Sequence, residues 1–152
     1  MNIKRYLTSL LGIILITLTI MQSSCKEDHM YKDIPNIFTD TTIYVGSMLY
    51  HNLESVGGWG YTPNGYKGLF IYCSAPGEYV AFERCCTYDP RLPESMVYYN
   101  PDELVLIDSA CCGARFSPWT GSPLNNDHAT IPLRPYRTQY YENRKMLKIT
   151  NY

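Results

Sequence analysis

The sequence predicts an all-β domain built from antiparallel strands. Three observations indicate this class. Short apolar runs recur along the chain from about residue 41, turn-forming glycine, proline and asparagine residues separate them, and no stretch has sustained helical periodicity. Tyrosine, which occurs 15 times in the 152 residues, is also a favourable strand residue. The chain is expected to form one domain with a single core.

The apolar runs follow one another in a regular order. The first two are TTIYVGSMLY at residues 41–50 and LFIYCSA at residues 69–75, with a glycine-rich stretch between them. EYVAFERC at residues 78–85, MVYYN at residues 96–100 and ELVLIDS at residues 103–109 come next, each bounded by proline-containing turns. Each of these runs is expected to form a strand.

The last segment, YRTQYYENRKMLKITN at residues 136–151, is expected to be a hairpin that turns near residues 142–144. In the run at residues 69–75, Leu69, Ile71 and Cys73 would share one face of a strand and the residues between them the other. Cys73 is therefore expected to be a buried core thiol.

Residues 1–24 are expected to be a secretory signal peptide that is removed before folding. Lys4 and Arg5 precede an apolar run over residues 10–21, which is shorter than the roughly 20 residues of a membrane span. The sequence QSSC at residues 22–25 resembles the lipobox of bacterial lipoproteins, which implies acylation of Cys25. The resemblance implies a protein anchored to the lipid of the bacterial outer membrane, facing the periplasm or the cell surface.

Polar residues without a pattern follow Cys25, so residues 25–40 are expected to be a tether and residues 41–152 the folded domain. Removal of the signal peptide leaves 11 of the 13 basic residues against 14 acidic residues. This balance gives no electrostatic attraction for nucleic acid. The expected partners are membrane lipid, through Cys25, and an envelope protein, a peptide or a glycan.

Four of the six cysteines form two adjacent pairs, Cys85-Cys86 in ERCCTYDP and Cys111-Cys112 in DSACCGARF. With the later elements Gly121 and IPLRPYRT, these loops resemble in their order the Rieske iron–sulfur domain, which implies a Rieske-like β-sandwich with two cysteine-bearing loops. The alignment of the loops implies four former cluster-ligand positions. Cys86 and Ser109 stand at the positions of the two cysteine ligands. Tyr88 and Cys112 stand at the positions of the two histidine ligands.

A Rieske centre holds one iron through two thiolates and the other through two neutral imidazoles. Tyrosine and serine must lose a proton to bind iron, which makes Tyr88 and Ser109 poor replacements at neutral pH. None of His29, His51 and His128 falls at a ligand position. The sequence therefore predicts a domain without a cofactor, and the alternative is a [2Fe–2S] cluster or a single metal ion.

The paired cysteines allow three outcomes. The resemblance implies that the two loops face each other, so that Cys86 and Cys112 would form a disulfide in an oxidising compartment, with Cys85 and Cys111 forming a second bond or staying buried. A metal ion would need three or four of these cysteines, although adjacent side chains in an extended chain point apart. Free thiols are the third outcome.

No motif indicates a cysteine nucleophile with its base, so an enzyme is not expected. Two functions remain open at the level of the sequence. The first is a structural or binding module that has lost its cluster. The alternative is an electron-transfer or redox protein with a non-standard iron–sulfur or mononuclear metal site at the paired cysteines.

Overall fold

The computed structural model describes residues 30–124 and 128–151. The predicted signal peptide, Cys25 and His29 lie outside these residues. Residues Tyr31–Tyr152 form one compact unit. In the described part of the chain, no helix has the length and apolar character needed to cross a membrane.

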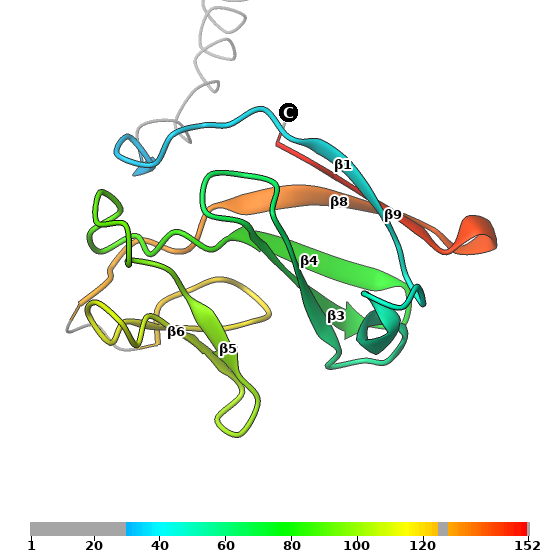
Figure 1. Ribbon diagram of the computed structural model, residues 1–152. Helices are drawn as coiled ribbons and strands as arrows, with labels where there is room; N and C mark the ends of the chain where they lie inside the picture. The colour runs from blue at the N-terminus through cyan, green and yellow to red at the C-terminus, as the bar shows by residue number, and fades with distance from the viewer. Residues whose placement is uncertain (1–29, 125–127, 152) are drawn as a thin grey trace, which may run out of the picture. The chain divides into compact units, whose positions relative to one another are not determined.

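Most strands belong to a single antiparallel sheet, and Figure 1 shows β5 and β6 beside β3 and β4. The order in this sheet is β1 (Asp40–Tyr44), β9 (Met146–Thr150), β8 (Pro135–Tyr141), β4 (Glu78–Glu83), β3 (Leu69–Ala75) and β2 (Trp59–Thr62). A smaller antiparallel sheet contains β5 (Tyr98–Asn100), β6 (Val105–Ile107) and β7 (Arg115–Phe116). The prediction of an all-β antiparallel fold is confirmed.

The ends of several predicted strands differ from the structure. β1 stops at Tyr44, because Gly46 has a φ of +85° and begins a turn that leads into the short 3-10 helix η1 (His51–Glu54). The expected strand over residues 41–50 is therefore wrong in its second half. The C-terminal hairpin is confirmed, since the 3-10 turn η2 (Glu142–Arg144) joins β8 to β9.

β3 is buried on both of its faces. Leu69, Ile71 and Cys73 pack on one side, and Phe70 and Tyr72 pack on the other, as the alternation in the sequence predicts. The first cluster contains Ile43, Val45, Leu53, Leu69, Ile71, Cys73, Tyr79, Ala81, Tyr136, Leu147 and Ile149. The second cluster contains Phe70, Tyr72, Phe82, Cys86, Val97, Tyr99, Leu106, Ala114, Phe116, Ala129 and Leu133. In the described residues, the expected single core is thus divided between two large clusters that share β3, and a smaller third cluster lies apart from them.

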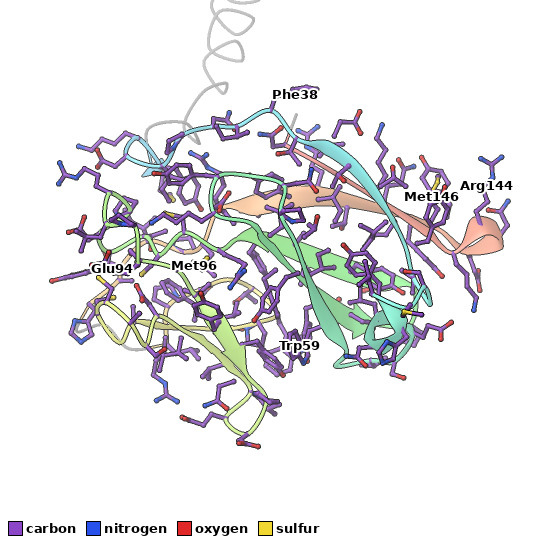
Figure 2. The ribbon with its side chains drawn as sticks, in the orientation of Figure 1. Phe38, Trp59, Glu94, Met96, Arg144 and Met146 are labelled. Carbon is purple, nitrogen blue, oxygen red and sulfur yellow. The ribbon has the colours of Figure 1, made fainter. Side chains whose placement is uncertain are left out.

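Aromatic side chains join the two sheets. The ring of Trp59 on β2 lies 5.4 Å from that of Tyr99 on β5, between centroids, and Trp59 is labelled in Figure 2. The hydroxyl of Tyr61 accepts a hydrogen bond of 2.8 Å from the backbone N–H of Tyr99. These contacts hold the small sheet, and with it the loop between β6 and β7, against the large one.

Residues 31–39, which the sequence analysis assigns to the tether, contact the domain. Tyr31 and Ile34 are buried, and they form a small cluster with Cys85. The guanidinium of Arg134 donates hydrogen bonds to the carbonyl oxygens of Tyr31 at 3.1 Å, Ile34 at 3.0 Å and Pro35 at 3.1 Å. These contacts attach the segment to the folded part of the chain.

Candidate functional site

The loop that follows β4 carries Cys86. Backbone hydrogen bonds continue beyond the end of β4, since Val97 N–H donates to Arg84 O at 2.8 Å and Cys86 N–H donates to Ser95 O at 3.3 Å. The Cys86 side chain belongs to the second cluster and is fully buried. This pairing fixes the position of the Cys86 thiol.

The loop between β6 and β7 carries Asp108 and Cys112. Its two ends are tied together, because Asp108 N–H donates to Ala114 O at 3.0 Å and Gly113 N–H donates to Asp108 O at 2.7 Å. Gly113 has a φ of +72°, which glycine adopts without the strain of a side chain. The closed turn brings the side chains of Asp108 and Cys112 together.

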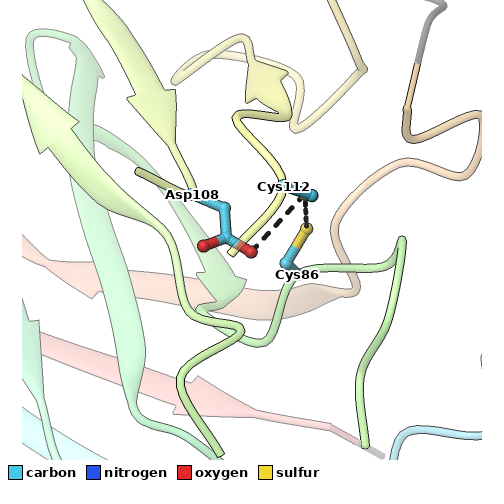
Figure 3. Close-up of side chains that lie close together, drawn as sticks. All are labelled: Cys86, Asp108 and Cys112. Carbon is cyan, nitrogen blue, oxygen red and sulfur yellow. Dashed lines mark hydrogen bonds between the residues drawn. The ribbon is translucent and has the colours of Figure 1, made fainter. Parts of the chain in front are cut away.

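The two loops meet in a thiol–carboxylate site made by Cys86, Asp108 and Cys112 (Figure 3). The Sγ atoms of Cys86 and Cys112 lie 3.7 Å apart, and Cys112 Sγ lies 3.6 Å from Asp108 Oδ2. The three potential ligand atoms all lie within 4.8 Å of one another. Cys86 and Asp108 are fully buried, whereas Cys112 is half-buried.

The Asp108 carboxylate has hydrogen-bond donors on both oxygens. The backbone N–H of Cys111 donates to Oδ1 at 3.1 Å, and the hydroxyl of Ser95 donates to Oδ2 at 3.3 Å. The thiol of Cys112 also donates to Oδ2. A buried carboxylate needs such partners, so the orientation of Asp108 is set by its neighbours.

Burial raises the pKa of the Cys86 thiol well above its usual value. A backbone hydrogen bond with Tyr88 acts in the opposite direction, whereas the neighbouring Cys112 and Asp108 raise the pKa further. The Cys86 thiol is consequently protonated at neutral pH. A protonated thiol is a poor nucleophile, so the geometry does not favour covalent catalysis by Cys86.

Of the site residues that the sequence predicts, Cys86 and Cys112 lie together in the structure. All five cysteines of the described chain are free thiols, so the predicted disulfide between these two is not formed in this structure, although its two partners meet. Cys85 points elsewhere, into the cluster with Tyr31 and Ile34, where burial raises its pKa to about 11. The four paired cysteines therefore do not share one site.

Tyr88 and Ser109, the two remaining predicted positions, are exposed. Tyr88 has 54% of its surface accessible, and its ring meets that of His128 edge-on with centroids 5.7 Å apart. Ser109 precedes a half-buried Cys111 in the exposed part of the turn. A Rieske centre needs two thiolates and two imidazoles, and the described residues do not offer that set at this site.

Asp108 is the residue that the sequence analysis missed. The family resemblance placed the ligand position at Ser109, one residue later. Strand alternation contains the missing signal, because Asp108 lies two residues after Leu106, which packs in the second cluster, and so points to the same side. A carboxylate continuing a buried strand face is a strong indication of a site.

No family model matches the sequence, and no curated protein matches it. Two of the solved structures that match this chain are the following. A chain from the complex of reduced oxygenase and oxidized ferredoxin in carbazole 1,9a-dioxygenase is 17% identical with a TM-score of 0.47, over 72% of this chain and 100% of that chain. The ferredoxin of carbazole 1,9a-dioxygenase from Nocardioides aromaticivorans IC177 is 14% identical with a TM-score of 0.45, over 74% of this chain and 99% of that chain.

Proposed function

We propose that this protein is a lipid-anchored protein of the bacterial envelope whose Rieske-like domain works without an iron–sulfur cluster, as a structural or binding module. The observation that carries the proposal is the direct contact of Cys86 and Cys112 at 3.7 Å. The two loops that would enclose a cluster touch through these side chains. The exposure of Tyr88 and Ser109 further supports the loss of the cluster.

The anchoring part of the proposal depends on the QSSC sequence that ends at Cys25. Only five residues separate Cys25 from Tyr31, which is packed on the domain. Six steps of fully extended chain reach about 20 Å. The domain would therefore be held close to the lipid surface, where an envelope protein, a peptide or a glycan is its expected partner.

The protonation of Cys86 and the hydrogen bonds of Asp108 also favour a binding module without catalysis. The raised pKa of Cys86 leaves little thiolate at neutral pH, and Asp108 is occupied by donors from Ser95 and Cys111. Neither group is free to act as a nucleophile or as a general base toward a bound molecule. The site is better suited to holding the two loops together.

The test is to isolate the native protein without oxygen and to measure its visible absorbance, iron, acid-labile sulfide and intact mass. We expect colourless protein without iron or sulfide, and a diacylglyceryl-modified Cys25. The Cys25→Ala variant is the control for anchoring, since it should leave the membrane fraction and keep the fold. Iron and sulfide in equal amounts would instead establish the electron-transfer alternative, and an unmodified Cys25 would disprove the anchor.

A further inference from the structure

We propose that Cys86, Asp108 and Cys112 form a binding site for a single divalent metal ion of the zinc type, held in tetrahedral geometry with water as the fourth ligand. The inference goes beyond the proposed function, which concerns the missing cluster and the anchor. It differs from the site expected from the sequence, because it uses one cysteine from each pair and a carboxylate in place of three or four thiols.

Two of the three distances between the side chains match those of such a site, and the third, between Cys86 Sγ and the Asp108 carboxylate, is within 4.8 Å. Zinc binds sulfur at about 2.3 Å and oxygen at about 2.0–2.2 Å, so a tetrahedral arrangement places two sulfur atoms about 3.8 Å apart and a sulfur and an oxygen about 3.6 Å apart. The observed separations are 3.7 Å between Cys86 Sγ and Cys112 Sγ, and 3.6 Å between Cys112 Sγ and Asp108 Oδ2. The loops need little movement to bind an ion.

The donor atoms select the class of metal. Two thiolates and one carboxylate suit a borderline ion such as Zn²⁺, whereas Mg²⁺ and Ca²⁺ prefer sites made of oxygen atoms alone. Three protein ligands leave one tetrahedral position for water. We expect solvent to reach that position, because Cys112 is half-buried and the space beside the Cα of Gly113 is open, with no atom outside the adjacent residues within 4 Å of an added Cβ.

Surrounding groups hold the ligands in place. Ser95 and the Cys111 N–H orient the Asp108 carboxylate, and the Ala114 N–H donates to Cys112 Sγ at 3.4 Å. Hydrogen bonds to the ligands themselves are a regular feature of metal sites, where they fix ligand orientation and tune basicity. The turn at residues 108–114 therefore supplies two ligands and two of the supporting donors, and Ser95 supplies the third.

The charge of the site also favours a cation. The Asp108 carboxylate is buried within reach of both thiols, and once the thiols give up their protons to bind an ion, the ion separates three neighbouring anions that would otherwise repel one another inside the protein. A divalent ion offsets two of the three negative charges. Metal binding should therefore replace the two thiol protons and release about two protons for each ion bound near neutral pH.

The experiment uses the full chain, reduced and freed of metal with a chelator, under argon. Co²⁺ is the first probe, because tetrahedral cobalt bound to thiolates has intense visible bands and a sulfur-to-metal charge-transfer band. We expect one Co²⁺ per chain, displacement by one Zn²⁺, and proton release on binding. A folded, reduced protein that takes up no Co²⁺ or Zn²⁺, or that gives the weak spectrum of octahedral cobalt, would overturn the inference.

Variants identify the ligands. Cys86→Ser and Cys112→Ala should each weaken Co²⁺ binding and at least halve the charge-transfer band, since one thiolate remains, and Asp108→Asn should weaken Zn²⁺ binding by at least about 10-fold. Cys111→Ser and Ser109→Ala are matched controls beside the ligands, and they should bind as the unchanged protein does. If Asp108→Asn does not fold, Cys112→Ala still tests the inference, since its side chain is half-buried. Full binding by Cys112→Ala, or loss of binding only in Cys111→Ser, would contradict it.

The two proposals fail separately. Native protein that contains iron and sulfide disproves the proposed function, whatever the metal-free chain binds afterwards. Failure of the reduced, metal-free chain to bind Co²⁺ or Zn²⁺ disproves the metal site, whether or not native protein is colourless and acylated at Cys25.

Discussion

The hydroxyl of Tyr136 on β8 donates a hydrogen bond of 3.1 Å to the carboxylate of Glu83 at the end of β4, inside the protein. Glu83 is fully buried, and three backbone N–H groups also donate to it, from Tyr66 and Lys67 at 2.8 Å and from Cys85 at 3.3 Å. The carboxylate thus joins two strands to the start of the loop that carries the thiols.

Replacing the Glu83 carboxylate by an amide should destabilise the domain. Glu83→Gln keeps the size of the side chain, but its NH₂ group cannot accept a hydrogen bond, and each buried donor left without an acceptor costs about 1–3 kcal/mol. Tyr136→Phe removes a single donor and should cost about 1 kcal/mol. Urea unfolding of both variants checks this order, and equal stability of Glu83→Gln and the unchanged protein would contradict it.

Gly65 lies against the same carboxylate, and a side chain there should not fit. An added Cβ would come within 2.7 Å of Glu83 Oε2, at a φ of +86°. Gly77, with a φ of +74° and 3.8 Å to its nearest neighbour, is the matched control. Gly77→Ala should lose about 1 kcal/mol through backbone strain alone, and Gly65→Ala should lose clearly more. Thermal unfolding of the two variants measures the difference, and equal losses would show that crowding at Gly65 is unimportant.

Oxidation of metal-free protein should link Cys86 to Cys112. They are separated by 26 positions in the sequence, and closing a loop of that size stabilises the folded state by roughly 3–4 kcal/mol in the chain-entropy model. Peptide mapping without reductant identifies the bond, and unfolding with and without reductant gives its effect. Cys111→Ser should form the same bond. A major product that links Cys85 to another cysteine would show that the loops rearrange.

Alkaline pH should weaken the reduced protein, because the folded state opposes the ionisation of its buried thiols. An unfolded cysteine begins to lose its proton near pH 8.5, whereas burial raises the pKa of folded Cys85 to about 11. Stability is therefore complete below about pH 8.5 and falls as the pH rises toward 11, by up to about 1.4 kcal/mol per pH unit for this thiol.

Cys86, whose pKa burial also raises, acts in the same direction. Denaturation midpoints measured from pH 7 to 11 should show the decline, and Cys85→Ala should make it shallower. A stability that rises over this range would contradict the burial of the two thiols.

The contact between Arg134 and residues 31–35 should protect the start of the domain from proteolysis. Lys32 is exposed between the buried Tyr31 and Ile34, so cleavage after it requires this segment to detach. Arg134→Gln loses most of the donors that hold the segment and should be cut faster by a lysine-specific protease. Arg137→Gln, a change at an exposed arginine on β8 three positions further along the chain, should be cut at the original rate. Equal rates for the two variants would show that Arg134 does not hold the segment.

The alternation of apolar residues and the turn-forming residues predict the strands well where the packing on neighbouring strands follows the same alternation. The alternation at residues 69–75 corresponds to two packed faces, and the turn at residues 142–144 is set by the two strands beside it. The burial of Tyr31 and Ile34 could not be predicted in this way. It depends on hydrogen bonds from Arg134, which is about 100 positions away in the sequence. Local periodicity carries no information about a contact between segments so far apart.

The sequence predicts two of the three residues of the candidate site. The family resemblance identified Cys86 and Cys112 as residues that meet, because their loops follow strands whose order is visible in the sequence. It assigned Ser109 instead of Asp108, since a resemblance between loops does not determine which side chain points inward. That depends on the register of β6 with β7, where Leu106 pairs with Phe116 and the strand ends just before Asp108.

The position of β3 between two clusters limits how this protein can change during evolution. Ile71 and Phe70 are adjacent in the chain but pack in different clusters, and the second cluster includes Cys86. A larger side chain in the first cluster that displaces β3 also displaces Phe70 and the packing beneath the thiol. Replacements on the far face of this strand are therefore coupled to the geometry of the site, and the two regions are expected to accumulate mutations together instead of drifting independently.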